Sequence, residues 1–524
     1  MKATVRFLTL LLVVVMMVSC FAACNKNKGD TTTTAGGGDN TTPAGGLGYE
    51  MPEKVNMNGY TYKAYVRSNA TTGGDTMQDG NPNFYCEDFW VDTSPEAAPP
   101  EDALSYAVYM RNKEIENDYN VKIRQVSQSI NMVQELTNFY GNSETYDLTV
   151  ILAISAAQAA TKNLLTELKG LSQLDLTHEA YDQNAIKELS MGGKLYYLSG
   201  DMNISTMDSV APMVVNLDRY RDYAEGFVEV FNDPMYQNVY SLVTNGKWTL
   251  DTMLALAKLA SSDADTSDGV LGSSDQDAIG YFQYNESAIY YFYGSGGRLT
   301  EMTEEGSPEF VIQNPKNQEL YNYIYNNFHP DMRNVKYPNG FSPARKQHFI
   351  SNADTLFTDM TLWDVRKDLY LNADFEYGLL PTPVYEAGDD YNAVVYFYNT
   401  VHLWAIPSLV GDIDKAQIMM NVMAAYSNAR IEGSTMDAYY DRTLYFTISP
   451  NPEARKVMDI IKGSTVYDIA LLYDWGGWRT HFSQLWFRKL PNQYNDLVGM
   501  MEMTAIPQLQ ETIELFKNPG TLID

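Results

Sequence analysis

The sequence predicts an α/β protein in which a mainly parallel sheet is flanked by helices. Strand and helix patterns alternate between residues 60 and 165, an order that is typical of parallel sheets. Residues 147–154 are apolar almost throughout, as expected of a strand covered on both faces. The chain has 524 residues, which at roughly 100–200 residues per domain suggests two to four domains.

Elements of the first half follow from local patterns. Alternating residues predict strands at 60–66 and 121–126. Apolar residues at helical spacing, after two prolines, predict a helix at 101–117. Thr249 is expected to cap a helix at 249–260, because its hydroxyl can accept from a free amide of the first turn.

Weaker patterns place the remaining elements. Strands are expected at 193–198, 211–216, 356–360, 377–380 and 402–406, and helices at 414–428, 453–462 and 495–517. Strand and helix patterns also alternate at 280–326, after a polar loop at 261–277.

The N-terminus has the pattern of a secretory signal peptide at residues 1–23. Lys2 and Arg6 precede an apolar run at 7–18, and small residues follow it. That run is shorter than the about 20 residues that a membrane-spanning helix needs. We therefore expect secretion rather than a transmembrane anchor.

The end of this segment resembles the bacterial lipobox, with Phe21 where leucine is usual. This resemblance implies cleavage before Cys24 and attachment of diacylglycerol to it. Cleavage near Ala23 without a lipid is the alternative. Residues 24–48, rich in Thr, Gly and Asn and free of aromatic residues, are expected to form a flexible tether.

Composition excludes several classes of function. Acidic residues outnumber basic ones 66 to 37, and such an excess repels nucleic-acid backbones, so no nucleic-acid partner is expected. Three cysteines exclude a disulfide scaffold, and cleavage would leave only Cys86. Five histidines make a His-rich metal centre improbable, and no cofactor and no metal are expected.

An ordered set of short motifs resembles one family. The matching stretches are Tyr146-Asp147-Leu148, residues 164–168, residues 193–198 with 216–218, residues 246–251, and residues 380–383 with 402–407. In this order they resemble bacterial extracellular solute-binding proteins of the carbohydrate type, the lipoprotein receptors of ABC importers.

The resemblance implies two α/β lobes, each with a mainly parallel sheet, joined by a hinge of crossing strands. Lobe one would contain 49–205 plus 402–455, and lobe two 206–398 plus 456–524. A sugar or oligosaccharide would bind between the lobes. The chain would act as a monomer, lipid-anchored on the outer face of the cell membrane, with ABC transporter permease subunits as partners.

Several ligand-binding residues are expected from this resemblance. Trp363 stands where relatives stack a tryptophan on a sugar ring, although a place in the core of lobe two is the alternative. Trp475 and Trp478 could form a second stacking wall or pack in an aromatic core. Ser155 occupies a position where maltodextrin-binding relatives carry charged residues, which puts maltodextrin itself in doubt.

Polar candidates lie near the first strand and the hinge. Arg67 and Asn69 follow the first strand, where relatives contact the ligand. Asp201, Asn203 and Asp208 lie near the first crossing, where carboxylates can accept hydrogen bonds from sugar hydroxyls. Capping of turns is the alternative role for these residues.

Other functions stay open at this point. The acidic loop at 263–277 fails the EF-hand pattern, so a solvated loop is the better interpretation than a calcium site. A secreted glycosidase also uses two carboxylates and aromatic platforms, and a lipid-anchored adhesin would carry the same N-terminus. We expect no enzymatic activity.

Overall fold

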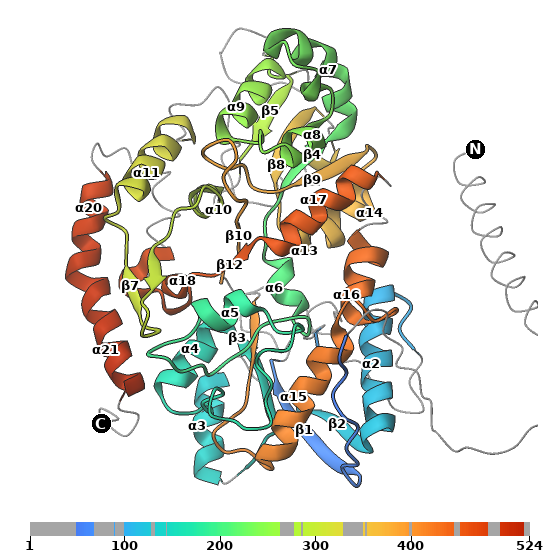
Figure 1. The fold of residues 1–524 in the computed structure, drawn as a ribbon, viewed down its shortest axis with the longest axis vertical. Helices are drawn as coiled ribbons and strands as arrows, with labels where there is room; N and C mark the ends of the chain where they lie inside the picture. The colour runs from blue at the N-terminus through green and yellow to red at the C-terminus, as the bar shows by residue number, and fades with distance from the viewer. Residues whose placement is uncertain are drawn as a thin grey trace, which may run out of the picture. The chain divides into compact units, whose positions relative to one another are not determined.

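Two separate four-stranded sheets organise the computed structural model of the protein (Figure 1). The structure describes residues 49–67, 88–89, 99–126, 132–142, 144–262, 277–283, 287–328, 349–351, 354–397, 401–444, 451–479 and 493–517. These residues belong to one compact unit, Gly45–Asp524. The predicted signal peptide, Cys24, the tether, Asn69 and the acidic loop at 263–276 lie outside the described residues.

The first sheet has the strand order β11-β3-β1-β2. Its strands are β1 (Tyr60–Val66), β2 (Val121–Val126), β3 (Leu148–Leu152) and β11 (His402–Ala405). β1 pairs parallel with β2 and β3, and β11 pairs antiparallel with β3. The helices around this sheet are α2 (Ala103–Tyr119), α3 (Met132–Asn142), α4 (Ala153–Thr161) and α15 (Ile413–Ser427) (Figure 1). This sheet is mainly parallel, as predicted.

The second sheet has the order β5-β8-β4-β9 and mixed directions. Its strands are β4 (Met213–Asn216), β5 (Ile279–Phe282), β8 (Thr355–Asp359) and β9 (Tyr377–Leu380). β5 pairs parallel with β8, but β4 pairs antiparallel with both β8 and β9. A mainly parallel arrangement is therefore wrong for this sheet. The chain enters β4 at the edge where β8 and β9 end, so β4 must run against them.

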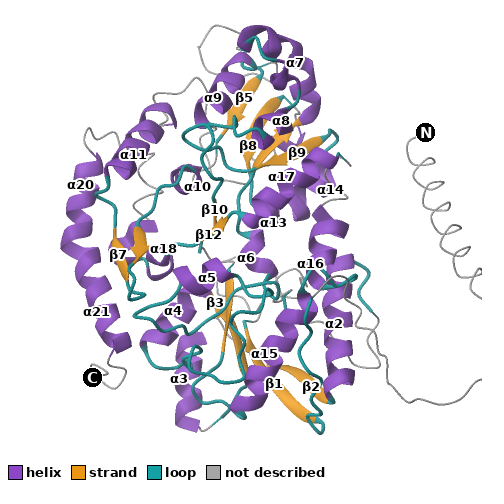
Figure 2. Cartoon of the chain, viewed as in Figure 1, coloured by secondary structure: helices purple, strands orange, loops and turns teal. Residues whose placement is uncertain are grey.

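Further helices and short strands complete the unit (Figure 2). They are α5 (Gln183–Glu188), α6 (Ile204–Asp208), α7 (Leu217–Phe231), α8 (Val239–Thr244), α9 (Leu250–Leu259), α10 (Ser287–Gly294), α11 (Pro315–Phe328), α13 (Leu362–Asp364), α14 (Tyr370–Asn372), α16 (Thr435–Asp437), α17 (Pro452–Gly463), α18 (Ile469–Tyr473), α20 (Gln493–Met500) and α21 (Ile506–Lys517). β6 (Thr300–Met302) pairs with β7 (Pro308–Phe310), and β10 (Ala393–Val394) with β12 (Thr465–Val466). The 3₁₀ helices are η2 (Pro234–Gln237) and η6 (Trp475–Gly477), and the π-helices are η4 (Val365–Leu369), η5 (Ala438–Leu444) and η7 (Met501–Ala505).

Capping residues set several helix ends. Thr249 accepts a hydrogen bond from the Thr252 amide at 3.1 Å and begins α9, as predicted. Asp102 caps α2 in the same way, so this helix begins at Ala103, two residues later than predicted. Among the described residues, no helix is long and apolar enough to cross a membrane.

The predicted strand at 193–198 is absent, and this segment makes only isolated bridges. Gly192 and Gly193 have φ values of 57° and 76°, so they form a turn rather than extended backbone. Leu198 then bridges to Trp404 of β11. At Gly200 a Cβ would lie 2.2 Å from the Ala180 carbonyl oxygen, so only glycine permits this approach.

Candidate ligand-binding site

Polar side chains gather at one edge of each sheet, which we call its carboxyl edge. In the first sheet β1 and β3 end at this edge, and β11 begins there because His402 pairs with Leu152. Arg67, Ser155 and His402 therefore belong to one edge. In the second sheet β5, β8 and β9 end at one edge, so Gln283 and Trp363 follow strands that end there. Open α/β sheets bind ligands at such edges.

Two crossing segments join the carboxyl edges of the two sheets. The segment that follows Leu198 runs antiparallel to β11 and so leads to the carboxyl edge of the first sheet. It continues through α6 to β4, which begins at the carboxyl edge of the second sheet. Residues 395–397, at the expected second crossing, precede β11 in the chain. The first crossing segment therefore connects the carboxyl edge of the first sheet to the carboxyl edge of the second. Its helix α6 lies between the two sheets (Figure 1).

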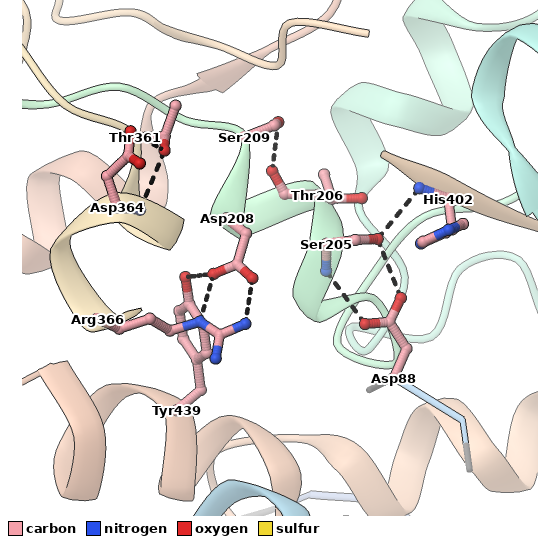
Figure 3. Close-up of polar contacts among 10 residues, drawn as sticks. All are labelled: Asp88, Ser205, Thr206, Asp208, Ser209, Thr361, Asp364, Arg366, His402 and Tyr439. Carbon is pink, nitrogen blue, oxygen red and sulfur yellow. Dashed lines mark hydrogen bonds and ion pairs between the residues drawn. The ribbon is translucent and has the colours of Figure 1, made fainter. Parts of the chain in front are cut away.

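The N-terminal end of α6 is fixed to the first sheet (Figure 3). Asn203 Nδ2 donates to the His402 carbonyl oxygen at 2.6 Å, and the His402 amide donates to Ser205 Oγ at 3.1 Å. The amide and hydroxyl of Ser205 donate to the Asp88 carboxylate at 3.1 and 3.0 Å. These bonds place the start of α6 against the start of β11.

The other end of α6 is fixed to elements that follow the second sheet (Figure 3). Arg366 of η4 donates to the Asp208 carboxylate through Nε, at 2.8 Å, and also through Nη2. The Tyr439 hydroxyl donates to the same carboxylate at 2.9 Å. The side chains of Arg366 and Asp208 are 4% and 7% exposed. Asp208 is therefore the partner of a buried ion pair, and its expected role as a ligand contact stays a prediction.

Three buried polar groups near these edges make no hydrogen bond within the described part of the chain. They are both ring nitrogens of His402, the side-chain amide of Gln283, and Asn203 Oδ1. Burial, reinforced by the charge of Arg67, lowers the pKa of His402 to about 3, so the imidazole is neutral near pH 7. A neutral imidazole offers one donor and one acceptor.

Sequence reasoning placed His402 only in a strand and did not consider Gln283. Both residues stand where a strand begins or ends at a carboxyl edge, and that position is the signal that could have found them. The buried carboxylate of Asp359, at the end of β8, is already engaged. It accepts from the Tyr281 hydroxyl at 2.7 Å and from Ser287 Oγ at 2.8 Å.

The two tryptophans expected to stack on a sugar have different surroundings. Trp363 is half-buried in α13, directly after β8. Trp475 is 4% exposed, stacks on Tyr473 with ring centroids 5.0 Å apart, and donates to Thr512 Oγ1 at 3.0 Å. Trp475 therefore has the aromatic core packing that the sequence left as the alternative, and Trp478 is buried in the same hydrophobic core.

Asp201 and Asn203 line a cavity of about 250 Å³, which we call the hinge cavity. The residues that line it come from the segments 179–184, 199–207, 436–440 and 462–467. Burial raises the pKa of Asp201 to about 7, although Lys462 and a hydrogen bond from Asn428 oppose that shift.

Solved structures with this arrangement include two sugar-binding proteins. A cyclo/maltodextrin-binding protein, solved with maltotetraose, has a TM-score of 0.54 at 15% identity, with 85% of this chain and 98% of that chain covered. The galacto-N-biose-/lacto-N-biose I-binding protein of the ABC transporter from Bifidobacterium longum, solved with lacto-N-biose, has a TM-score of 0.52 at 9% identity, with 87% and 98% covered.

The chain has the two-lobed periplasmic-binding-protein fold. The fold implied by the sequence motifs is thereby confirmed, whereas the limits given for the two lobes stay a prediction. No protein-family model and no curated protein matches the sequence.

The Asp208–Arg366 pair gives the first prediction. Arg366→Met should lower the free energy of unfolding by about 3–5 kcal/mol, because it leaves a buried carboxylate without its charged partner. Adding Asp208→Asn should recover part of that loss, since neither charge then remains. The control is Arg221→Met, whose ion pairs are exposed and should contribute less than about 1 kcal/mol. Chemical denaturation of the variants measures each value, and equal losses for Arg366→Met and Arg221→Met would contradict the assignment.

Asp201 gives a pH-dependent prediction. Because its pKa is raised, Asp201 is protonated in the folded state and ionised in the unfolded state between about pH 4 and pH 7. This carboxyl group therefore makes stability fall as pH rises through that range, by up to about 1.4 kcal/mol per pH unit. Asp201→Asn should remove that slope in denaturation curves recorded from pH 4 to pH 8. The exposed Asp390→Asn is the control and should keep it.

Proposed function

We propose that this chain is an extracytoplasmic receptor that captures a sugar or oligosaccharide between its two lobes and delivers it to an ABC importer. The observation that carries the proposal is the set of buried polar side chains at the carboxyl edges of both sheets that make no hydrogen bond to any described residue. His402 is the side chain of this kind at the edge of the first sheet, and Gln283 is the one at the edge of the second sheet. Buried polar groups normally have partners, so a ligand with hydroxyl groups is a fitting occupant.

The proposed chemistry of capture is hydrogen bonding with aromatic contact. The neutral imidazole of His402 and the amide of Gln283 each offer donors and acceptors to hydroxyl groups. Arg67 and Ser155 stand at the same edge as His402, and Trp363 offers an indole face to the C–H side of a sugar ring. Hinge motion at the crossing segments would then close the lobes over the ligand.

The fold comparison supports a carbohydrate ligand. Both similar structures are named as proteins that bind oligosaccharides. One was solved with maltotetraose and the other with lacto-N-biose. A glycosidase is less well supported, because it needs two carboxyl groups free to act on the glycosidic bond. The buried carboxylates near the edges, Asp208 and Asp359, are both held by hydrogen bonds from protein groups.

Membrane attachment through Cys24 is the second part of the proposal. The signal-peptide pattern, the lipobox-like stretch and the tether at 24–48 support a receptor held at the outer face of the cell membrane. Attachment keeps the ligand-loaded lobes near the permease subunits. We propose a monomer as the acting form.

The ligand hypothesis predicts the behaviour of Trp363→Ala. Calorimetry of the full-length chain with maltotetraose, lacto-N-biose and a wider oligosaccharide panel should identify a ligand that stays chemically unchanged. Against that ligand the variant should bind about ten- to a hundredfold more weakly, since it loses an aromatic contact and its buried area. The melting temperature without ligand should stay close to that of the unsubstituted protein.

Trp475→Ala is the matched control for this experiment. It should lower stability by about 3–5 kcal/mol, as expected for a core tryptophan, while the folded fraction keeps its affinity. A Trp363→Ala variant that loses stability and keeps affinity would refute the stacking role. Release of hydrolysed sugar by the unsubstituted protein would instead establish an enzyme.

The lipid anchor has its own prediction. Cys24→Ala should move the protein from the membrane fraction to the soluble fraction, or leave an uncleaved precursor, because the acyl chains have no attachment point. Fractionation and mass spectrometry of the N-terminal peptide measure both outcomes. Unsubstituted protein that is wholly soluble and carries no lipid would end the anchor hypothesis.

A further inference from the structure

The hinge cavity has a buried floor and an exposed mouth. Asn203, Thr206, Tyr440 and Tyr467 contribute buried side chains to the floor. The mouth is formed by exposed residues. They are Glu179, Gln183, Asn184, Lys462 and Gly463. Of the described lining residues, none is His402, Gln283 or Trp363, so the cavity is distinct from the sugar site proposed above.

Two of the three lining carboxylates are already engaged. Asp182 accepts from the amides of Asn184 and Ala185 at the start of α5, and from the Tyr467 hydroxyl at 2.7 Å. Glu179 pairs with Arg430 at 2.8 Å. These two carboxylates shape the cavity and have little capacity left for an occupant.

The remaining polar groups have unused capacity. Asp201 accepts one hydrogen bond, on Oδ2 from Asn428, and its Oδ1 has no described donor. Asn203 is fully buried and its Oδ1 accepts no hydrogen bond within the described residues. The Lys462 ammonium lies over the ring of Tyr440, 4.4 Å from its centroid, and its charge also acts on Asp201. Within the described part of the chain, Lys462 forms no ion pair shorter than 4 Å, and the Tyr440 hydroxyl has no hydrogen-bond partner.

Charge and size limit the class of occupant. The Lys462 ammonium opposes a cation, and the carboxylates of Asp182 and Glu179 oppose an anion. No group of described His, Cys, Asp or Glu side chains here or elsewhere could hold a metal ion. At about 250 Å³ the cavity is smaller than the roughly 300–1,000 Å³ pockets that take drug-sized ligands.

We propose that the hinge cavity is a second binding site, for a small neutral polyol of at most the size of one sugar ring. A hydroxyl group both donates and accepts, which this mixed lining requires. The hydroxyls of the polyol would donate to Asp201 and accept from Lys462 Nζ and the Tyr440 hydroxyl.

A bound polyol would act on the hinge. Asp201 and Asn203 belong to the first crossing segment, whereas Lys462 ends α17, which packs against β9 of the second sheet. An occupant that bonds to both would tie the crossing segment to α17 and slow its local opening. This effect does not depend on whether the carboxyl edges bind an oligosaccharide.

The test compares four probes of similar size, of which two are neutral, one is a cation and one is an anion. Calorimetry or saturation-transfer NMR of the full-length chain should show binding of sorbitol and glucose, and at least tenfold weaker binding of glucosamine and gluconate. Lys462→Met and Tyr440→Phe should each weaken sorbitol binding at least tenfold. Lys456→Met, on the exposed face of the same helix, should leave it unchanged.

Hydrogen exchange supplies a second readout that does not rely on the variants. Saturating sorbitol should slow exchange of amides within residues 199–203. The proposal is overturned if sorbitol and glucose do not bind up to tens of millimolar, or if binding is insensitive to Lys462→Met. It is also overturned if a charged probe binds more tightly, or if exchange at 199–203 is unaffected by bound sorbitol.

Discussion

The fixation of α6 at both ends is the constraint on which the rest of this structure depends. Asn203 and Ser205 bond the start of this short helix to His402 and Asp88 beside the first sheet. At its other end Asp208 is held by Arg366. Because a buried ion pair tolerates little misalignment, the crossing segment enters the second sheet at one place and in one direction. The reversed direction of β4 follows from this.

The large excess of acidic over basic residues raises the question of how buried carboxylates are stabilised. The chain has 66 acidic and only 37 basic residues, but it has 39 tyrosines. Tyrosine hydroxyls donate to a series of internal carboxylates, in the pairs Tyr60–Asp147, Tyr281–Asp359, Tyr293–Asp468, Tyr439–Asp208 and Tyr467–Asp182. Neutral donors thus satisfy acidic groups for which few cations are present. Burial raises the pKa of Tyr281 and Tyr467 well above the ordinary value, and the neighbouring carboxylates of Asp359 and Asp182 raise it further.

The sequence predicted those features that depend on local patterns. The strands at 60–66, 121–126 and 377–380 agree residue for residue, and the Thr249 cap is present, because alternation and capping act within a few residues. The direction of β4 could not be predicted in this way, since it depends on the edge of the second sheet at which the crossing segment enters. The same limit applies to Gly200, whose tight contact is with the backbone of Ala180.

The site could be predicted only in part, for a related reason. Residue type and position suggest Asp208 and Trp475 as ligand contacts, and these roles stay predictions. The protein partners of the two side chains, Arg366 and Thr512, lie far away in the sequence and give no local signal. Conversely, His402 lies within an apolar strand pattern and gives no signal of its own. It becomes a candidate only when strand pairing shows at which edge it stands, and when its ring nitrogens prove to have no hydrogen-bond partner among the described residues.

The placement of tryptophans also determines what an optical experiment on this protein would observe. Trp248, Trp404, Trp475 and Trp478 are at most 4% exposed, whereas Trp363 is half-buried. A collisional quencher such as iodide reaches an indole only through contact with solvent. Among the described tryptophans, Trp363 is therefore the emitter most open to quenching, and it stands directly after a strand of the second sheet. The native fluorescence of the chain thus contains an unlabelled reporter close to that carboxyl edge.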